Sequence, residues 1–296
     1  MNKRIFRANT FLFLCAAIWG LAFVAQRVAT GTLGNFTFNG IRFLLGGLSM
    51  VPLILLDKRK ESFEPGSPSR LSTALIPGLI AGVILFIAAA LQQVGLVGTT
   101  AGKAAFITGL YIVLIPLAGI FLKHKMGLNS WVGAGVATLG LYLLSITADF
   151  NISGWDLLEL IGAFFWTAHI LIIGYYTQKV SILRLAIIQY LVTGVLSLVV
   201  AFFFEPWDWP GIQNTLVPIL YGGFGSVGIA YTLQILGQRD APPAAASLIL
   251  SLETVFAALA GWFILGEVLG GRELLGAGLM FAGMVVSQWS WEKKHD

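Results

Sequence analysis

The chain is poor in charge and in the residues from which most catalytic and metal sites are built. Of its 296 residues, 11% are charged, three are His and one is Cys. A soluble globule of this length needs a polar surface, and a composition that is 57% hydrophobic leaves too little for it. The lone Cys15 excludes an internal disulfide framework and a cysteine-based metal site. No Gly-x-x-x-x-Gly-Lys-Ser/Thr phosphate loop occurs, so coupling to ATP would need another subunit.

Long apolar segments fill the chain instead, and its mean hydropathy is +0.85. A membrane-spanning helix needs about 20 apolar residues, because its backbone polar groups must be satisfied within the segment. Gly, Pro, Asn and charge clusters divide the chain into about ten such segments. The expected ranges are 10–28, 36–56, 72–96, 100–122, 128–146, 155–177, 183–204, 214–236, 242–265 and 271–290. We therefore predict an all-α, multi-pass integral membrane protein with no soluble catalytic or nucleic-acid-binding module.

The two halves of the chain repeat one hydrophobic pattern. Matched positions lie 142, 143 or 147 residues apart, as in Gly119/Gly261, Gly133/Gly276, Trp19/Trp166, Phe43/Tyr190 and Gly47/Gly194. We divide the chain into repeats 1–148 and 149–296 of about five helices each, and an odd number of spans makes the second repeat enter from the opposite face. Inverted repeats are the usual basis of alternating access, so the pattern indicates transport.

Basic residues concentrate in every second connection, which predicts the sidedness of the chain. The basic residues on one side are Lys3, Arg4, Arg7, Lys58, Arg59, Lys60, Arg70, Lys123, Lys125, Lys179, Arg184, Arg239, Lys293 and Lys294. The opposite connections hold Asp149, Asp156, Glu205, Asp208, Glu267 and Glu273, with Arg272. We expect both termini in the cytoplasm, and we interpret the net charge of +4 as a topology signal rather than a nucleic-acid footprint.

The basic start and the apolar run that follows it also fit a cleavable signal peptide. We favour a retained helix, because Ala16 and Trp19 in this run have counterparts at Ala163 and Trp166. A removable segment has no reason to be part of a repeat.

Three local patterns suggest a family. They are Ala17-Ile18-Trp19-Gly20, Ile41-Arg42-Phe43, and Leu252-Glu253 with Leu265-Gly266-Glu267. The chain resembles, over essentially its whole length, the EamA-like branch of the drug/metabolite transporter superfamily. The resemblance implies a ten-helix, inverted-repeat carrier of small metabolites, and many such carriers are bacterial inner-membrane exporters of amino acids and related compounds. The family commonly has Pro after the Glu of the ninth helix, whereas Thr254 follows here, which leaves open whether that helix is kinked.

An ionisable side chain at membrane depth costs at least ~2.5–3.5 kcal/mol, so such residues usually face a bundle interior or a cavity. Glu253 lies eleven residues into the range 242–265, too deep to reach an interface easily. Ala246, Ala257 and Ala260 share its helical face, which indicates close packing. Both a hydrogen-bonded structural carboxylate and a site for a substrate amine or a proton fit this position.

His169 shares a helical face with Glu159, Trp166 and Ile173, a half-polar stripe typical of a cavity. We favour a neutral His that bonds a neighbouring backbone carbonyl over a proton relay, which stays an alternative. Metal ligation is not expected, because no second His or Cys is placed to help.

Two cations join these groups near the outer side. Arg42 matches Gln189 in the repeat, so both halves keep a long polar side chain at this position, which favours a lined interior. Lys103 stands at the start of a helix, where a cation opposes the helix dipole. A substrate carboxylate or Glu253 would relieve that cost, and we leave substrate contact and structural pairing of Lys103 both open.

Aromatic side chains lie in the same segments, with Trp19 and Phe23 on one helical face. Such stripes more often pack than bind, and their coincidence with the buried charges strengthens the alternative of a pocket. The predicted substrate-binding set is Trp19, Phe23, Arg42, Lys103, Tyr111, Trp166, His169, Tyr231 and Glu253.

The function predicted from these features is secondary transport of a small polar or amphipathic metabolite, amino-acid-like or an organic anion, across a bacterial inner membrane. We expect export, with import or exchange as the alternative. We expect no cofactor and no metal, and we keep protons as coupling ion and a homodimer as open interpretations. A polytopic enzyme acting on lipid is a weaker alternative, because no nucleophile and base stand at a catalytic spacing.

Overall fold

Helices form every regular element of the residues that the computed structural model describes, namely 3–57, 71–121, 127–145, 152–266, 268 and 270–288. They are α1 (Lys3–Ala29), α2 (Asn35–Asp57), α3 (Leu71–Gly95), α4 (Ala101–Gly109), α5 (Tyr111–Phe121), α6 (Leu128–Ser145), α7 (Gly154–Tyr176), α8 (Ile182–Phe204), α9 (Trp209–Asn214), α10 (Leu216–Leu220), the π-helix η1 (Tyr221–Tyr231), α11 (Thr232–Asp240), α12 (Pro243–Leu250), α13 (Glu253–Leu265) and α14 (Gly271–Gln288). The predicted all-α class is confirmed.

Eight helical stretches in the described residues are long and apolar enough to cross a membrane. They are Lys3–Ala29, Asn35–Leu53, Thr73–Gly95, Ala101–Phe121, Gly154–Tyr176, Ile182–Phe204, Leu216–Asp240 and Pro243–Ile264. Each overlaps one of the expected ranges, and the chain is a multi-pass membrane protein. The expected range 128–146 contains a shorter apolar helix, Leu128–Leu144, and the range 271–290 contains α14.

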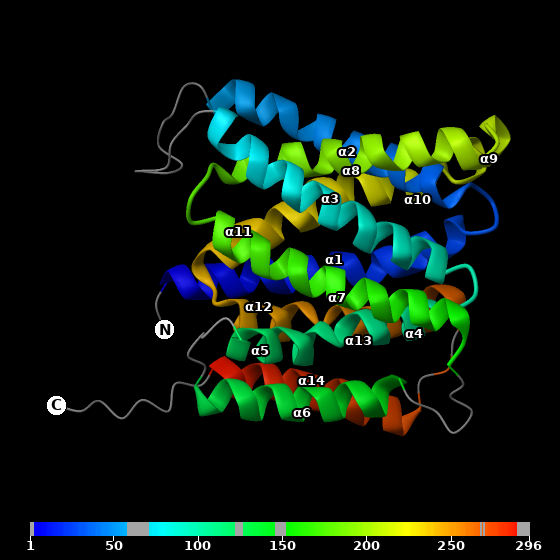
Figure 1. The fold of residues 1–296 in the computed structure, drawn as a ribbon. Coiled ribbons are helices and arrows are strands. Elements are labelled where there is room, and N and C mark those ends of the chain that lie inside the picture. The colour runs from blue at the N-terminus through cyan, green and yellow to red at the C-terminus, as the bar shows by residue number, and fades with distance from the viewer. Residues whose placement is uncertain are drawn as a thin grey trace.

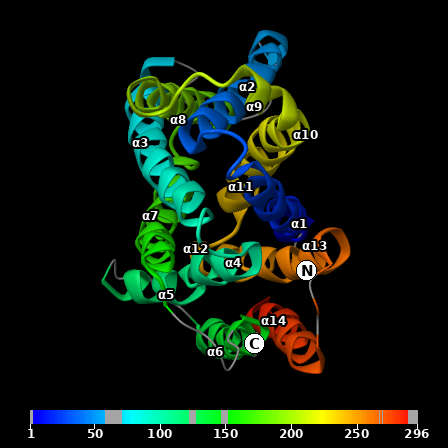
Figure 2. The same cartoon turned by 90° about the vertical axis from the view of Figure 1, so that its right-hand side faces the viewer.

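The helices run side by side, and α6 and α14 form a pair at one edge of the bundle (Figures 1 and 2). This pair approaches closely through glycine. A Cβ added to Gly133 would lie 2.7 Å from the carbonyl oxygen of Gly283, and one added to Gly276 would lie 2.6 Å from that of Gly140. Small residues permit such backbone contact where lipid offers no hydrophobic drive for helix association.

Two of the expected helices are divided, which the sequence did not predict. The range 100–122 is split at Leu110 into α4 and α5, and the range 242–265 is split at Ser251 and Leu252 into α12 and α13. At the breaks, Leu110 N–H donates to Ile107 O and Leu252 N–H to Ile249 O, one residue short of an α-helical bond. The Ser251 hydroxyl also donates to a backbone carbonyl, a competition that weakens regular helix.

The two breaks meet in space. The Thr254 hydroxyl donates to the carbonyl of Ala105 at 3.1 Å, and a Cβ on Gly109 would lie 2.9 Å from the Thr254 hydroxyl oxygen. The helix is thus interrupted without the Pro that the family resemblance implies, and Thr254 links the two broken helices.

Many residues of the charge pattern lie outside the described part of the chain. They are Lys58, Arg59, Lys60, Arg70, Lys123, Lys125, Asp149, Glu267, Lys293 and Lys294. Within the described part, the start of α1 and the end of α14 lie at the same end of the bundle (Figure 1).

Candidate functional site

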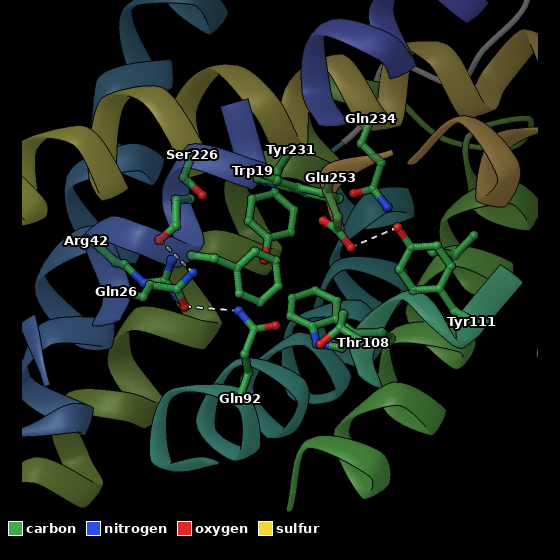
Figure 3. Close-up of a pocket in the computed structure, with 14 residues that line it drawn as sticks. Trp19, Gln26, Arg42, Gln92, Thr108, Tyr111, Ser226, Tyr231, Gln234 and Glu253 are labelled. Atoms are coloured by element: carbon green, nitrogen blue, oxygen red, sulfur yellow. Dashed lines mark hydrogen bonds between the residues drawn. The ribbon is translucent and has the colours of Figure 1, made fainter. Parts of the chain in front are cut away.

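A small cavity lies among α1, α2, α3, α4, α5, α7, η1, α11 and α13, and Figure 3 shows the side chains around it. Its lining residues are Trp19, Ala22, Phe23, Gln26, Arg42, Gln92, Thr108, Tyr111, Trp166, Ile170, Ser226, Tyr231, Gln234 and Glu253. The cavity has a volume of about 30 Å³, which admits water and excludes a metabolite. The bundle would therefore have to widen around the cavity to bind a metabolite.

The structure brings together seven of the nine residues in the predicted binding set. Trp19, Phe23, Arg42, Tyr111, Trp166, Tyr231 and Glu253 all line the cavity, although they come from six different helices. Lys103 and His169 do not line it.

Arg42 forms one polar end of the cavity together with glutamines. Its Nε donates to Asn39 Oδ1 at 2.9 Å and its Nη2 to Gln26 Oε1 at 3.2 Å. Gln92 Nε2 donates to the same Gln26 oxygen at 3.1 Å. The guanidinium carbon also lies 4.8 Å from the ring centre of Phe43, a cation–π contact. These partners are all neutral, and in the described part of the chain no carboxylate lies within ion-pair distance of Arg42.

Glu253 forms a second polar end, on the other side of the cavity (Figure 3). Tyr111 donates its phenolic hydrogen to Glu253 Oε1 at 2.9 Å. Gln234 stands nearby, and its amide has no hydrogen-bond partner among the described residues. The Glu253 side chain begins at the first residue of α13, directly after the break, where helix N–H groups favour negative charge.

Aromatic rings separate the two polar ends. The rings of Trp19 and Tyr231 are 4.6 Å apart, and those of Trp166 and Tyr231 are 6.2 Å apart and stacked. The indole N–H groups of Trp19 and Trp166 have no acceptor within the residues described. The rings therefore offer an aromatic wall and two free donors to a bound molecule.

Lys103 and His169 lie beyond this cavity in bonded positions. Lys103 Nζ forms an ion pair with Asp156 Oδ2 at 2.7 Å, between α4 and α7. His169 is fully buried, and its Nε2 shares a hydrogen bond of 2.9 Å with Gln189 Oε1. His169 also packs edge-on against Trp166 and Tyr231, behind the aromatic surface.

The sequence did not single out the polar side chains Gln26, Gln92, Thr108, Ser226 and Gln234, which line the cavity. Two features of the sequence could have indicated these residues. Gln26 follows Trp19 and Phe23 at helical spacing, and Gln92 and Gln234 lie 142 residues apart, an offset of the repeat. Among the described residues, no group of three or more His, Cys, Asp or Glu is gathered as metal ligands.

Comparison with known proteins finds relatives that are named as transporters. The chain is 31% identical to an uncharacterized transporter of Archaeoglobus fulgidus, over 96% of this chain and 86% of that protein. It is 26% identical to an S-adenosylmethionine/S-adenosylhomocysteine transporter of Chlamydia trachomatis, over 92% of this chain and 88% of that one. A crystal structure at 19% identity superposes with a TM-score of 0.78, over 95% of this chain and 97% of that chain, which shows a shared fold.

A model of one protein family matches the chain twice, over residues 6–146 and 153–288. The two matches together cover nearly all of the sequence, as the resemblance in the local patterns implied. The chain belongs to the EamA-like transporter family.

Proposed function

We propose that the chain is a secondary transporter that exports a small polar or amphipathic metabolite, amino-acid-like or an organic anion, by alternating access. The observation that supports this most is the central cavity, whose buried cation, Arg42, has only neutral partners among the described residues. A buried charge without a counter-charge is costly, and a substrate carboxylate or other anion would supply one.

The cavity residues support a two-repeat carrier. Four matched pairs line it: Trp19/Trp166 and Phe23/Ile170 at an offset of 147, and Gln92/Gln234 and Tyr111/Glu253 at an offset of 142. The helix breaks are matched too, since α4 and α12 start 142 residues apart, as do α5 and α13. We propose ten spanning helices in two inverted repeats, 1–148 and 149–296, with both termini in the cytoplasm. Rocking of one repeat against the other would open the cavity alternately to the two sides.

The chemistry of the cavity favours a zwitterion with a flat or apolar body. Arg42 suits a carboxylate, Glu253 suits an ammonium or another cation, and the rings of Trp19, Trp166 and Tyr231 lie between them. S-adenosylhomocysteine, named for the chlamydial relative, has an amino acid at one end and an adenine at the other. It is therefore a useful first probe beside simple amino acids and organic acids.

We place the protein in the inner (plasma) membrane of a bacterium, as a multi-pass carrier that acts without nucleotide. Its apolar helices and its family support this location. Naming of relatives as transporters also favours transport over the lipid-enzyme alternative.

The test is counterflow in proteoliposomes without nucleotide, using labelled S-adenosylhomocysteine and a panel of amino acids and organic acids. We expect saturable exchange of at least one anionic or zwitterionic probe, and strong loss of that exchange in Arg42→Gln. Exchange that the variant leaves unchanged would remove the cavity from the transport pathway. Vesicles of defined orientation then separate export from import, and turnover of bilayer lipid by the purified protein would favour the enzyme alternative.

A further inference from the structure

A second buried carboxyl, that of Glu159 in α7, lies beside the cavity. Glu159 is 1% exposed, and neither of its carboxyl oxygens has a hydrogen-bond partner among the described residues. No cation of the described chain lies within ion-pair distance of it either. The Thr108 hydroxyl, on the cavity wall, lies next to the carboxyl without completing a hydrogen bond.

Asp156, about one helical turn from Glu159, shows what a structural carboxylate looks like in this helix. Asp156 accepts hydrogen bonds from Lys103 at 2.7 Å, from the Thr99 hydroxyl at 2.9 Å and from the Ser153 hydroxyl at 2.8 Å. It caps α7 and joins it to α4. Glu159 has none of these partners, so neither capping nor pairing explains its presence.

Packing does not explain the carboxyl of Glu159 either, because an apolar residue fills the matched position of the other repeat. Leu12 of α1 lies 147 positions before Glu159, and Gly95 of α3 lies 142 positions before Gly237 of α11. A Cβ added to Gly95 would lie 2.8 Å from Glu159 Cγ, and one added to Gly237 would lie 2.6 Å from Leu12 Cγ. The same side-chain position thus packs into the same glycine gap in both repeats, and Leu12 fills it with no exposed surface.

The carboxyl of Glu159 is therefore additional to what the packing needs. An ionised carboxylate without a partner is costly in an interior, whereas a carboxylic acid is neutral. We propose that Glu159 is the proton-binding site that couples transport to proton movement, an inference that rests on the proposed transport function. When the bundle opens and water reaches the carboxyl, its O–H bond breaks and the proton passes to water, leaving a carboxylate. Closing requires the carboxylate to take a proton back.

The position of Glu159 suits this exchange. On the side of the cavity, Glu159 lies beside Thr108. On the side of the start of α7, its nearest charged groups are Asp156 and the partner of Asp156, Lys103. The other helices packed on α7 bring few ionisable groups within the described chain. Tyr111 of α5 bonds Glu253, Arg239 and Asp240 lie at the far end of α11, and α3 and α12 bring none. Of the two carboxyls of α7, Asp156 is paired and Glu159 is not, so Glu159 is the one free to exchange a proton with water that enters the cavity.

The experiment uses two variants of the whole protein in proteoliposomes. Glu159→Leu copies the residue that fills the matched gap, and Glu159→Gln keeps the shape of the carboxyl. We expect both to fold with a Tm close to that of the unaltered protein. For labelled S-adenosylhomocysteine, we expect both to lose accumulation driven by a pH gradient and to keep counterflow, because exchange requires no net proton movement. Loss of counterflow to the same extent as accumulation would indicate a merely structural role and overturn the proposal.

A direct measurement tests the proton site without a substrate. Infrared difference spectra between acid and alkaline pH should contain the carbonyl stretch of a buried carboxylic acid. Two buried carboxyls, Glu159 and Glu253, can contribute to this band. We expect one component of the band to be lost in Glu159→Gln and in Glu159→Leu and to persist in Glu253→Gln. An unchanged spectrum in the Glu159 variants would overturn the proposal. If the unaltered protein transports no probe, the transport function fails and the infrared result alone decides on the proton site.

Discussion

The two halves of the molecule share their packing positions and differ in their buried ionisable ones. Gly133 and Gly276 occupy matched positions, and so do Trp19 and Trp166. By contrast, Arg42 matches Gln189, Tyr111 matches Glu253, Ala22 matches His169 and Leu12 matches Glu159. Each ionisable member of these pairs is buried. The comparison teaches that the repeat specifies the bundle, whereas the chemistry is concentrated where the repeat is broken.

The largest effect should come from breaking a shared packing position. In Gly133→Leu and Gly276→Leu, the new side chain would meet the backbone of the partner helix, which cannot rotate away. We expect both to lose more free energy of unfolding than the ~1–3 kcal/mol of ordinary overpacking, and to do so equally. Thermal unfolding in detergent measures this. Gly135→Leu and Gly278→Leu are the controls, because a Cβ there meets nothing within 4 Å. Equal losses in variants and controls would contradict the matched packing of α6 and α14.

The next effect concerns Arg42, which Arg42→Gln converts to the residue of the other half. We expect affinity for a carboxylate ligand to fall by about 2–5 kcal/mol, the usual cost of losing one partner of a buried charge pair. Ligand-induced thermal shifts measure it. The amide of the same ligand serves as control and should bind both proteins alike. If acid and amide lose equally, Arg42 does not recognise the negative charge.

A smaller effect is expected from His169→Ala, which copies Ala22. The change removes the bond of 2.9 Å to Gln189 and leaves a fully buried amide without its partner. We expect a loss of about 1–3 kcal/mol in the free energy of unfolding. Adding Gln189→Leu should recover part of the loss, because no unsatisfied amide then remains. A double variant that is less stable than His169→Ala would argue against this bond as the main role of His169.

The smallest effect should come from Tyr111→Phe, which removes one hydrogen bond to Glu253 and keeps the ring. We expect about 0.5–1.5 kcal/mol in stability, measured as a change in Tm. Tyr175→Phe is the control, because Tyr175 is 57% exposed. Equal shifts in the two variants would mean that the Tyr111–Glu253 bond contributes no measurable stability.

Much of the fold was predictable because membrane helices leave a strong apolar signal. The expected ranges agree with the helices within a few residues at most ends, as for 155–177 and α7. The breaks at Leu110 and Ser251 were not predictable, because they depend on local backbone bonds and on the contact of Thr254 with Ala105. The π-helix η1 was missed as well, since its glycine-rich sequence also suits an α-helix packed closely on α2.

The site was predictable where depth and helical face decide, as for Arg42 and Glu253. The site was not predictable where the role of a residue depends on its contacts with another helix. Lys103 pairs with Asp156, 53 residues away on another helix, and the spacing in sequence gives no sign of that contact. The glutamines were overlooked because an uncharged side chain at membrane depth is a weaker signal than a charge. Comparison of the halves would have found Gln92 and Gln234.

The central claim is that one cavity between the two repeats opens alternately to both sides of the membrane. Ser226 lines that cavity, and Cys15 is the single cysteine of the chain, so Cys15→Ala with Ser226→Cys gives one reporter thiol. The measurement is its labelling by a membrane-impermeant maleimide, added to one side of oriented vesicles and then to the other. The account predicts labelling from both sides and protection by a transported ligand. Labelling from only one side, under every condition in which counterflow proceeds, would contradict it.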